Sequence, residues 1–352
     1  MLDTPTTPSL DLRVLARNLD DLTPQDVAAM RRLFDESPTA HTFQLPEYAR
    51  FCSASDRAPI VLTARDGDVL VGYWLVHFEQ YRRMGLPMFT AMARSGPVLR
   101  ADVASDPRRA LEAFAHAAIE AVFRRRTKKL VVTSETDYGA LMSDVLPRLD
   151  FEREAIETFV IDLTAPLEEI EKRVNKAAMR GVRSAERAGL LVEAASTAGD
   201  ADAYRPVLAE VLSQGGLEAL PGPDFGERWL RLNQERPSPL LYGRDEGGSV
   251  AGGVLFFGAG ALALNYHTAV RRNPPRLGDL LVWRQIVMAR EMGFQRFDLL
   301  TVMPNPEPDT HEAGMRAFKA KWGGDLVSTP VFTYRPPRSV AYRATKALLG
   351  HL

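Results

Sequence analysis

The cations of one segment are spaced to bind an anionic ligand. From Pro166 to Gly189 the sequence predicts a single amphipathic helix, because a proline stands near its start and a glycine ends it. Like charges recur on its polar side: Lys172, Lys176, Arg180, Arg183 and Arg187. Like charges at this spacing destabilise a helix by about 0.2–0.5 kcal/mol per pair, a cost that a phosphate-bearing ligand would offset. A solvated face without a ligand is the alternative interpretation.

Side chains capable of acid–base chemistry lie on an expected strand, "ALALNYHTAV", over 261–270. Strand alternation predicts Asn265 and His267 on one face and Tyr266 on the other. Buried, hydrogen-bonded Tyr and His side chains without a chemical role are the alternative. The following strand ends at Asp298, whose carboxylate either faces a cleft or caps a loop.

Two lysines stand in the stretch "FKAKWGG", over 318–324. Phe318 and Trp322 have helical spacing, and the Gly-Gly pair suits a helix end, since glycine tolerates the left-handed conformation there. Lys319 is therefore either a solvated charge at the end of a helix or a charge aimed into a site.

The elements that must position these residues occur twice along the chain. Each copy consists of a strand–turn–strand segment, a long amphipathic helix and a short strand: 59–78, 108–126 and 130–135, then 239–258, 277–293 and 294–300. This order predicts an α/β fold with mixed sheets flanked by helices. We expect two closely packed domains, over 1–155 and 156–352, with a loop over 213–225.

Composition excludes several classes of protein. The net charge of −1 gives no global field that would attract nucleic acid. Cys52 is the only cysteine, which excludes an internal disulfide and suits a reducing cytoplasm. The six histidines lack metal-ligand spacing, so we expect no metal. The acidic N-terminus does not resemble a signal peptide, and the most apolar run is too short to cross a bilayer, so we expect a soluble cytoplasmic protein.

The ordered motifs of the second half resemble those of the FemA/FemB-like aminoacyltransferases, which use the acetyltransferase (GNAT) fold twice. The matching segments are the basic helix around 180–190, the "LLVW" helix with Trp283, the strand over 293–298 and "FKAKWGG". The first half matches more loosely, through "TFQLPEY" over 42–48 and "RSGPVL" over 94–99. The resemblance implies two tandem GNAT-like domains in the compact form of the family, without its coiled-coil insertion.

This resemblance implies transfer of an amino acid from aminoacyl-tRNA to an amine of a peptidoglycan precursor, which builds an interpeptide bridge. The acceptor would be UDP-MurNAc-pentapeptide or lipid II, with a peripheral contact to the inner membrane face. Aminoacyl-tRNA would be a co-substrate, so no bound cofactor is expected. Lys319 is implied to lie by the reacting ester, where its ammonium would stabilise the oxyanion, and His267 or the leaving group would accept the proton of the amine.

Further residues are assigned to substrate binding by the same resemblance. Arg180 and Arg183 are implied to contact phosphates of the precursor or tRNA, and Tyr266 to line the peptide channel. The same class of role is expected for Lys176, Trp283 and Asp298.

The sequence also departs from the family pattern and leaves alternatives open. Leu99 and Arg100 replace an expected acidic residue, and Phe51 and Cys52 stand where a lysine is expected. One alternative is a GNAT-fold N-acyltransferase that uses acyl-CoA in envelope or polysaccharide modification, although a glycine-rich phosphate loop is missing. Another is a non-catalytic protein that binds tRNA or a precursor. The basic stretch over 123–129 and the basic C-terminal tail are either phosphate contacts or solvated chain.

Overall fold

The computed structural model describes residues 12–37, 41–53, 58–83, 86–103, 106–123, 127–134, 139–214, 222 and 224–336. Most of the loop expected over 213–225, the arginines of the basic stretch over 123–129 and the basic C-terminal tail lie outside the described residues.

The first half of the chain consists of consecutive antiparallel strands, a long helix and the elements around them. Its elements are β1 (Val14–Asn18), α1 (Pro24–Glu36), α2 (Pro46–Cys52), β2 (Ile60–Asp66), β3 (Val69–Arg83), β4 (Leu86–Arg94), β5 (Val98–Leu99), α3 (Pro107–Phe123), β6 (Lys129–Thr133) and α4 (Gly139–Val145).

The second half repeats this order with more helices before its hairpin. Its elements are β7 (Glu152–Asp162), α5 (Leu167–Arg173), α6 (Lys176–Arg187), β8 (Val192–Ala194), α7 (Ala198–Gln214), α8 (Phe225–Glu235), β9 (Leu240–Arg244), β10 (Val250–Ala259), β11 (Leu262–Val270), α9 (Leu277–Glu291), β12 (Arg296–Asp298), α10 (His311–Ala320) and β13 (Asp325–Tyr334).

The strands form one continuous mixed sheet in which the predicted repeat is visible. Its order is β1-β2-β3-β4-β6-β13-β7-β12-β11-β10-β9-β8, with β5 beside β3. Among the described strands, two pairs are parallel, β4 with β6 and β11 with β12, and each pair is joined through a helix, α3 or α9. The expected α/β fold with hairpin, helix and strand built twice is therefore confirmed.

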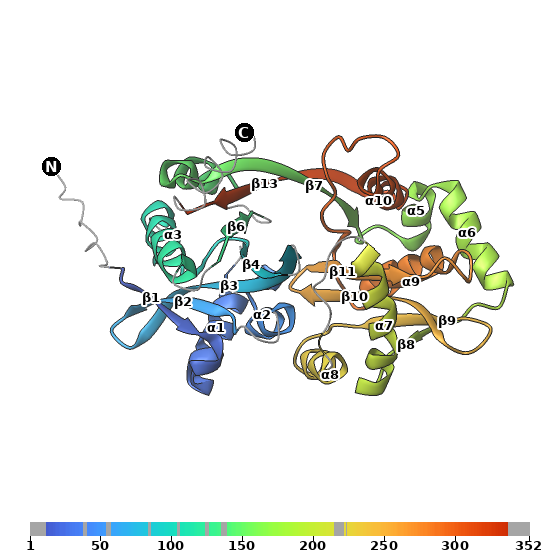
Figure 1. Cartoon of the computed structure of the whole chain (residues 1–352), viewed down its shortest axis with the longest axis horizontal. Helices are drawn as coiled ribbons and strands as arrows, with labels where there is room; N and C mark the ends of the chain where they lie inside the picture. Colours follow the sequence, from blue (N-terminus) through green and yellow to red (C-terminus); the bar gives the residue numbers. More distant parts are fainter. Residues whose placement is uncertain are drawn as a thin grey trace.

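Two long strands connect the halves (Figure 1). β13 is antiparallel to β7 through Asp325↔Val160 to Thr333↔Glu152, and its last residues also pair with β6 of the first half. The expected boundary between residues 155 and 156 lies inside β7, and the division into two domains stays a prediction.

One hydrophobic cluster joins the halves, as expected from the absence of a long linker. Phe43 and Tyr48 of the first half pack there with Trp229 and Phe257 of the second. The Tyr48 hydroxyl donates to the carbonyl oxygen of Gly258, 3.1 Å away, which ties α2 directly to β10. The two halves therefore share a core.

The single helix expected over 166–189 is wrong, because two helices occupy this range. α5 ends at Arg173, Val174 is extended (φ −67°, ψ 139°), and α6 begins at Lys176. Asn175 caps α6, since its side-chain oxygen accepts from the backbone N–H of Ala177 at 2.7 Å. The expected apolar face is nevertheless buried, because both helices keep that face toward the sheet.

Candidate functional site

A cavity of about 490 Å³ extends along β7 and β13 to the point where β11 and β12 separate. The two parallel strands pair from Leu262↔Arg296 to Leu264↔Asp298, after which β12 ends and β11 continues. Crevices at the carboxyl ends of parallel strands are common ligand sites in α/β proteins. Its lining is mixed, and its polar members include Thr158, Arg296, Asp298, Thr301, Asp325 and Thr329.

Lys319 is hydrogen-bonded to two residues that line this cavity. Its ammonium donates to the carbonyl oxygens of Leu300 and Thr301, at 3.1 and 3.0 Å, and both of these residues line the cavity. Burial lowers the pKa of Lys319 to about 8, partly opposed by the carboxylate of Asp298. An ammonium has three N–H donors, so one remains for a ligand.

Asp298 fixes the turn that holds Lys319. The carboxylate accepts from the hydroxyl of Thr158 and from the backbone N–H of Leu300, the latter at 2.6 Å. Leu300 has a φ of 59°, in the left-handed region that a leucine rarely adopts, and the bond from Asp298 supports it there. Asp298, Leu300, Thr301 and Lys319 therefore form one connected unit.

The two lysines of "FKAKWGG" have different surroundings. Trp322 is fully buried and anchors the end of α10. Lys321 forms an ion pair with the buried carboxylate of Asp279 in the first turn of α9, and its ammonium lies 3.9 Å from the Phe318 ring centroid. Lys321 therefore joins α10 to α9, whereas Lys319 binds the carbonyls of two cavity-lining residues.

Tyr266 and His267 do not alternate as expected for β11. A bulge shifts the register so that Leu255 faces His267 while Phe256 faces Asn265, which leaves Tyr266 without a partner position on β10. The Tyr266 and His267 ring centroids are consequently 4.1 Å apart, and Tyr266 stacks on Phe257. The expectation of opposite faces for these two residues is therefore wrong.

The environment of His267 is set by the first half of the chain. Burial lowers the pKa of His267 to about 4, Arg94 lowers it further, and Glu79 acts in the opposite direction. The carboxylate of Asp298, by contrast, raises the pKa of Lys319 and of His41 against the effect of burial. His267 thus lies on β11 and Lys319 on α10, each with its own charged neighbours.

Sequence reasoning missed a polar cluster from the first half. Glu79 lies 3.4 Å from His77 and 3.3 Å from Arg94, and although burial would raise the pKa of Glu79, these two neighbours lower it to about 2. Burial also lowers the pKa of His41 to about 4, while Asp298 raises it and Arg94 lowers it. Arg94 begins "RSGPVL" and His41 precedes "TFQLPEY". Both motifs were noted for their resemblance to the family, but no site residue was assigned from them.

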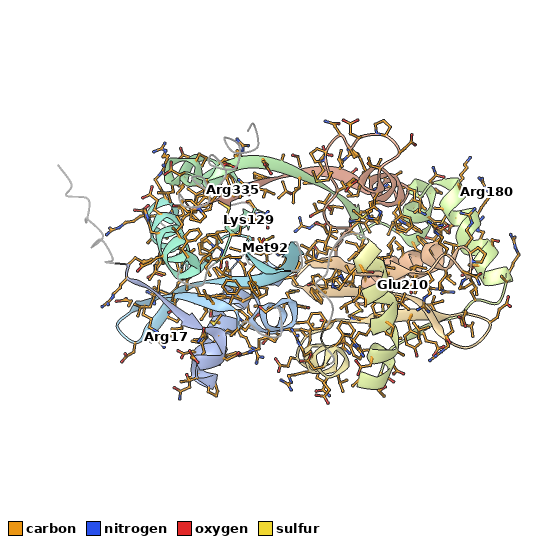
Figure 2. All side chains as sticks on the ribbon, viewed as in Figure 1. Arg17, Met92, Lys129, Arg180, Glu210 and Arg335 are labelled. Atoms are coloured by element: carbon orange, nitrogen blue, oxygen red, sulfur yellow. The ribbon has the colours of Figure 1, made fainter. Side chains whose placement is uncertain are left out.

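The remaining expected site residues lie elsewhere. Trp283 is 8% exposed in the core between α9 and the sheet, on the face opposite to the cavity. Lys176, Arg180 and Arg183 are exposed on α6, and Figure 2 shows Arg180 at the outer edge of the molecule. Arg183 is paired with Glu171. The structure therefore does not bring these residues to Lys319, and their roles stay predictions.

The described residues contain neither a metal-binding cluster nor a membrane-spanning helix. No group of three or more His, Cys, Asp or Glu side chains is arranged there to hold a metal ion. None of the described helices has the length and hydropathy needed to span a membrane.

The fold is that of known tandem GNAT proteins. FemX superimposes with a TM-score of 0.67 at 14% identity, over 93% of this chain and 98% of FemX. The C-terminal domain of a protein described as a lysylphosphatidylglycerol synthetase, from Agrobacterium fabrum, gives 0.58 at 15% identity, over 92% and 96%. A tandem GNAT protein from the clavulanic acid biosynthesis pathway gives 0.54 at 16% identity, over 92% and 98%.

At these identities the likeness shows the fold alone. No protein-family model and no curated protein matches the sequence.

Proposed function

We propose that this tandem GNAT chain is a FemA/FemB-like acyltransferase that moves an amino acid from aminoacyl-tRNA to an amine of a peptidoglycan precursor. The observation that carries the proposal is the ammonium of Lys319, held by the backbone carbonyls of two residues that line the 490 Å³ cavity. The likeness to FemX supports the same class of protein.

The reaction replaces an ester bond with an amide bond. The acceptor amine attacks the ester carbonyl, the carbonyl oxygen becomes an oxyanion, and the remaining N–H of Lys319 donates to it. Removing one such donor typically lowers kcat by about 10²–10³-fold. The amine loses its proton, and the departing tRNA hydroxyl gains one, so the products are an amide and an alcohol. We assign transient acceptance of the proton to the neutral His267 or to the leaving-group oxygen; the lowered pKa of His267, about 4, makes it the weaker base of the two.

The first turn of α9 favours an aminoacyl ester over acyl-CoA as donor. A helix N-terminus binds phosphate through its free N–H groups and its dipole. Here the carboxylate of Asp279 is buried in that turn and neutralised by Lys321. A Cβ placed on Gly181 of α6 would lie 2.2 Å from the Asp279 carboxylate, so α6 covers it closely. A pyrophosphate would have to displace this carboxylate.

The second candidate is an acyl-CoA-dependent transferase. The likeness to the tandem GNAT protein of the clavulanic acid pathway supports it, since that structure is described as being without AcCoA. A lipid acceptor is a further variant of the first proposal, supported by the likeness to the lysylphosphatidylglycerol synthetase domain. A non-catalytic binding protein for tRNA or precursor is the third possibility that the assay must separate.

Mass spectrometry of acceptor molecules tests these candidates together. The purified chain is incubated with total charged tRNA and, in separate arms, UDP-MurNAc-pentapeptide, lipid II or phosphatidylglycerol, with acetyl-CoA replacing the tRNA in a parallel set. We expect a peptidoglycan precursor to gain the mass of one amino acid residue, and ribonuclease to abolish the gain. A mass gain only on phosphatidylglycerol would identify a lipid as the acceptor. A mass gain only in the acetyl-CoA arms would identify acyl-CoA as the donor. No gain in any arm contradicts catalysis and favours the binding protein.

Two variants of the same segment separate chemistry from stability. Lys319→Ala removes the proposed donor, so we expect kcat to fall by about 10²–10³-fold with little loss of folded protein. Lys321→Ala leaves the buried Asp279 with only its longer contact to the exposed Arg276, at 3.7 Å, so we expect a lower melting temperature and a smaller effect on kcat. Retention of turnover by Lys319→Ala would refute the proposed role.

A further inference from the structure

A second cavity, of about 260 Å³, lies where α2 of the first half meets α8 of the second. The two helices are in contact, α2 in the first half and α8 in the second (Figure 1). No residue lines both this cavity and the one at Lys319. The mechanism proposed above therefore does not use it.

Several charged groups around this second cavity join the two helices. Arg228 of α8 donates to the carbonyl oxygens of Arg50, Phe51 and Ser53 at the end of α2, at 2.7, 2.8 and 3.0 Å. Arg31 bridges Glu47 of α2 and Glu235 of α8. These contacts fix the walls of the cavity and leave few polar groups available.

Two buried polar atoms in the wall have no partner among the described residues. The Glu47 side chain is 2% exposed, and its Oε1 accepts from the Arg31 Nε at 2.5 Å, but its Oε2 has no hydrogen bond. The hydroxyl of Ser53, a residue only 6% exposed, is also without a partner. A buried carboxylate oxygen that lacks a donor is destabilising, so a bound donor would be favoured.

The same wall contains an arginine side chain that forms no ion pair with a described carboxylate. Arg231 of α8 is exposed, and within the described part of the chain no carboxylate lies within 4 Å of it. The cavity therefore offers an oxygen pair that needs N–H donors and a guanidinium that can bind a carboxylate bidentately.

We propose that this cavity binds a free α-amino acid in its zwitterionic form. The ammonium binds Glu47 Oε2 and Ser53 Oγ, and the carboxylate binds Arg231. A water molecule occupies about 30 Å³ of liquid volume, so the cavity exceeds what one bridging water would fill and has room for a small amino acid. The inference does not depend on the proposed transferase activity.

Occupancy would also connect the two halves. Glu47 and Ser53 belong to the first half and Arg231 to the second, so the ligand would bridge α2 and α8. Because a ligand that binds only the folded chain shifts the unfolding equilibrium, binding raises the melting temperature in a concentration-dependent way.

Calorimetry and thermal melting of the full chain with glycine, L-alanine, L-serine and L-lysine test the proposal. Acetylated L-alanine and L-alaninamide serve as probes that lack one charge each. We expect at least one free amino acid to bind and to raise the melting temperature, and both blocked forms of alanine to bind at least about 10-fold more weakly than alanine itself. No binding by any free amino acid, or equal binding by the blocked forms, would overturn the proposal.

Variants locate the site. Glu47→Gln keeps the shape but removes the charge, and Arg231→Ala changes an exposed side chain that leaves the fold intact. Each should weaken amino acid binding by about 10-fold or more, since each removes a charged hydrogen bond. Arg153→Ala, an exposed arginine on β7, is the matched control and should bind as the parent does. Unchanged affinity in Arg231→Ala would show that the ligand lies elsewhere, even if Glu47→Gln fails to fold.

Discussion

The ammonium nitrogen of Lys319 lies 3.0 Å from the carbonyl oxygen of Thr301 and is held by backbone rather than by a direct carboxylate partner. A salt bridge would raise the pKa of the lysine, whereas neutral carbonyls in a buried setting leave it lowered to about 8. The lysine is thus positioned by atoms that do not titrate, while its own charge changes close to neutral pH.

Activity that depends on the Lys319 ammonium should therefore fall as pH rises through about 8. The protonated form is present below this pKa and is lost above it. His267, with a pKa of about 4, stays neutral above pH 5 and gives no limb in this range. Measuring kcat from pH 6 to 10 should show the decrease.

Lys319→Arg is the control for that decrease, because a guanidinium stays protonated throughout this range. The falling limb near pH 8 should disappear in this variant even if its kcat is lower. A limb that persists in Lys319→Arg would assign the titration to another group.

Asp298→Asn should move the same limb to lower pH. The Asp298 carboxylate raises the pKa of Lys319 against the effect of burial, so its removal lowers that pKa further. The amide oxygen of asparagine can still accept from Leu300, which preserves the turn. A pH profile of kcat compared with that of the parent measures the shift, and an unmoved or raised limb would contradict the coupling.

The repeated hairpins were predictable because period-two apolar patterns and glycine-containing turns are local features of the sequence. The break between the two helices at Val174 and Asn175 was not predictable, because the apolar spacing continues through it. Only the bond from the Ala177 N–H to the capping side chain of Asn175 reveals the second helix. The bulge in β11 depends on its pairing with β10, which no local pattern contains.

The candidate site was predictable only in part, for a similar reason. "FKAKWGG" drew attention to Lys319, but its two carbonyl partners come from a turn that tertiary structure places. Glu79 and Arg94 lie 15 residues apart on neighbouring strands, and their meeting with His267 requires the packing of both halves.

Gly181→Ala should destabilise the chain by about 1–3 kcal/mol, because the new Cβ would lie 2.2 Å from the buried Asp279 carboxylate. Gly314→Ala on α10 is the matched control, since nothing lies within 4 Å of its Cβ position. Alanine there should be neutral or stabilise by about 0.5–1 kcal/mol. Urea unfolding gives both values, and equal stability of the two variants would show that α6 does not cover Asp279.

The exposed cations of α6 differ in their pairing, and this difference should appear in tRNA binding. Lys176 and Arg180 have no carboxylate within 4 Å in the described part of the chain, whereas Arg183 is paired with Glu171. If α6 contacts phosphates, Lys176→Ala and Arg180→Ala should each weaken binding and reduce the slope of log affinity against log salt by about 0.7–0.9. Arg183→Ala should change the slope less, because its guanidinium is already partly neutralised. Binding titrations between 50 and 200 mM salt measure these slopes. Because Arg180 lies at the outer edge of the molecule, unchanged slopes in all three variants would mean that this face is solvated and that tRNA, if bound, approaches Lys319 from another side.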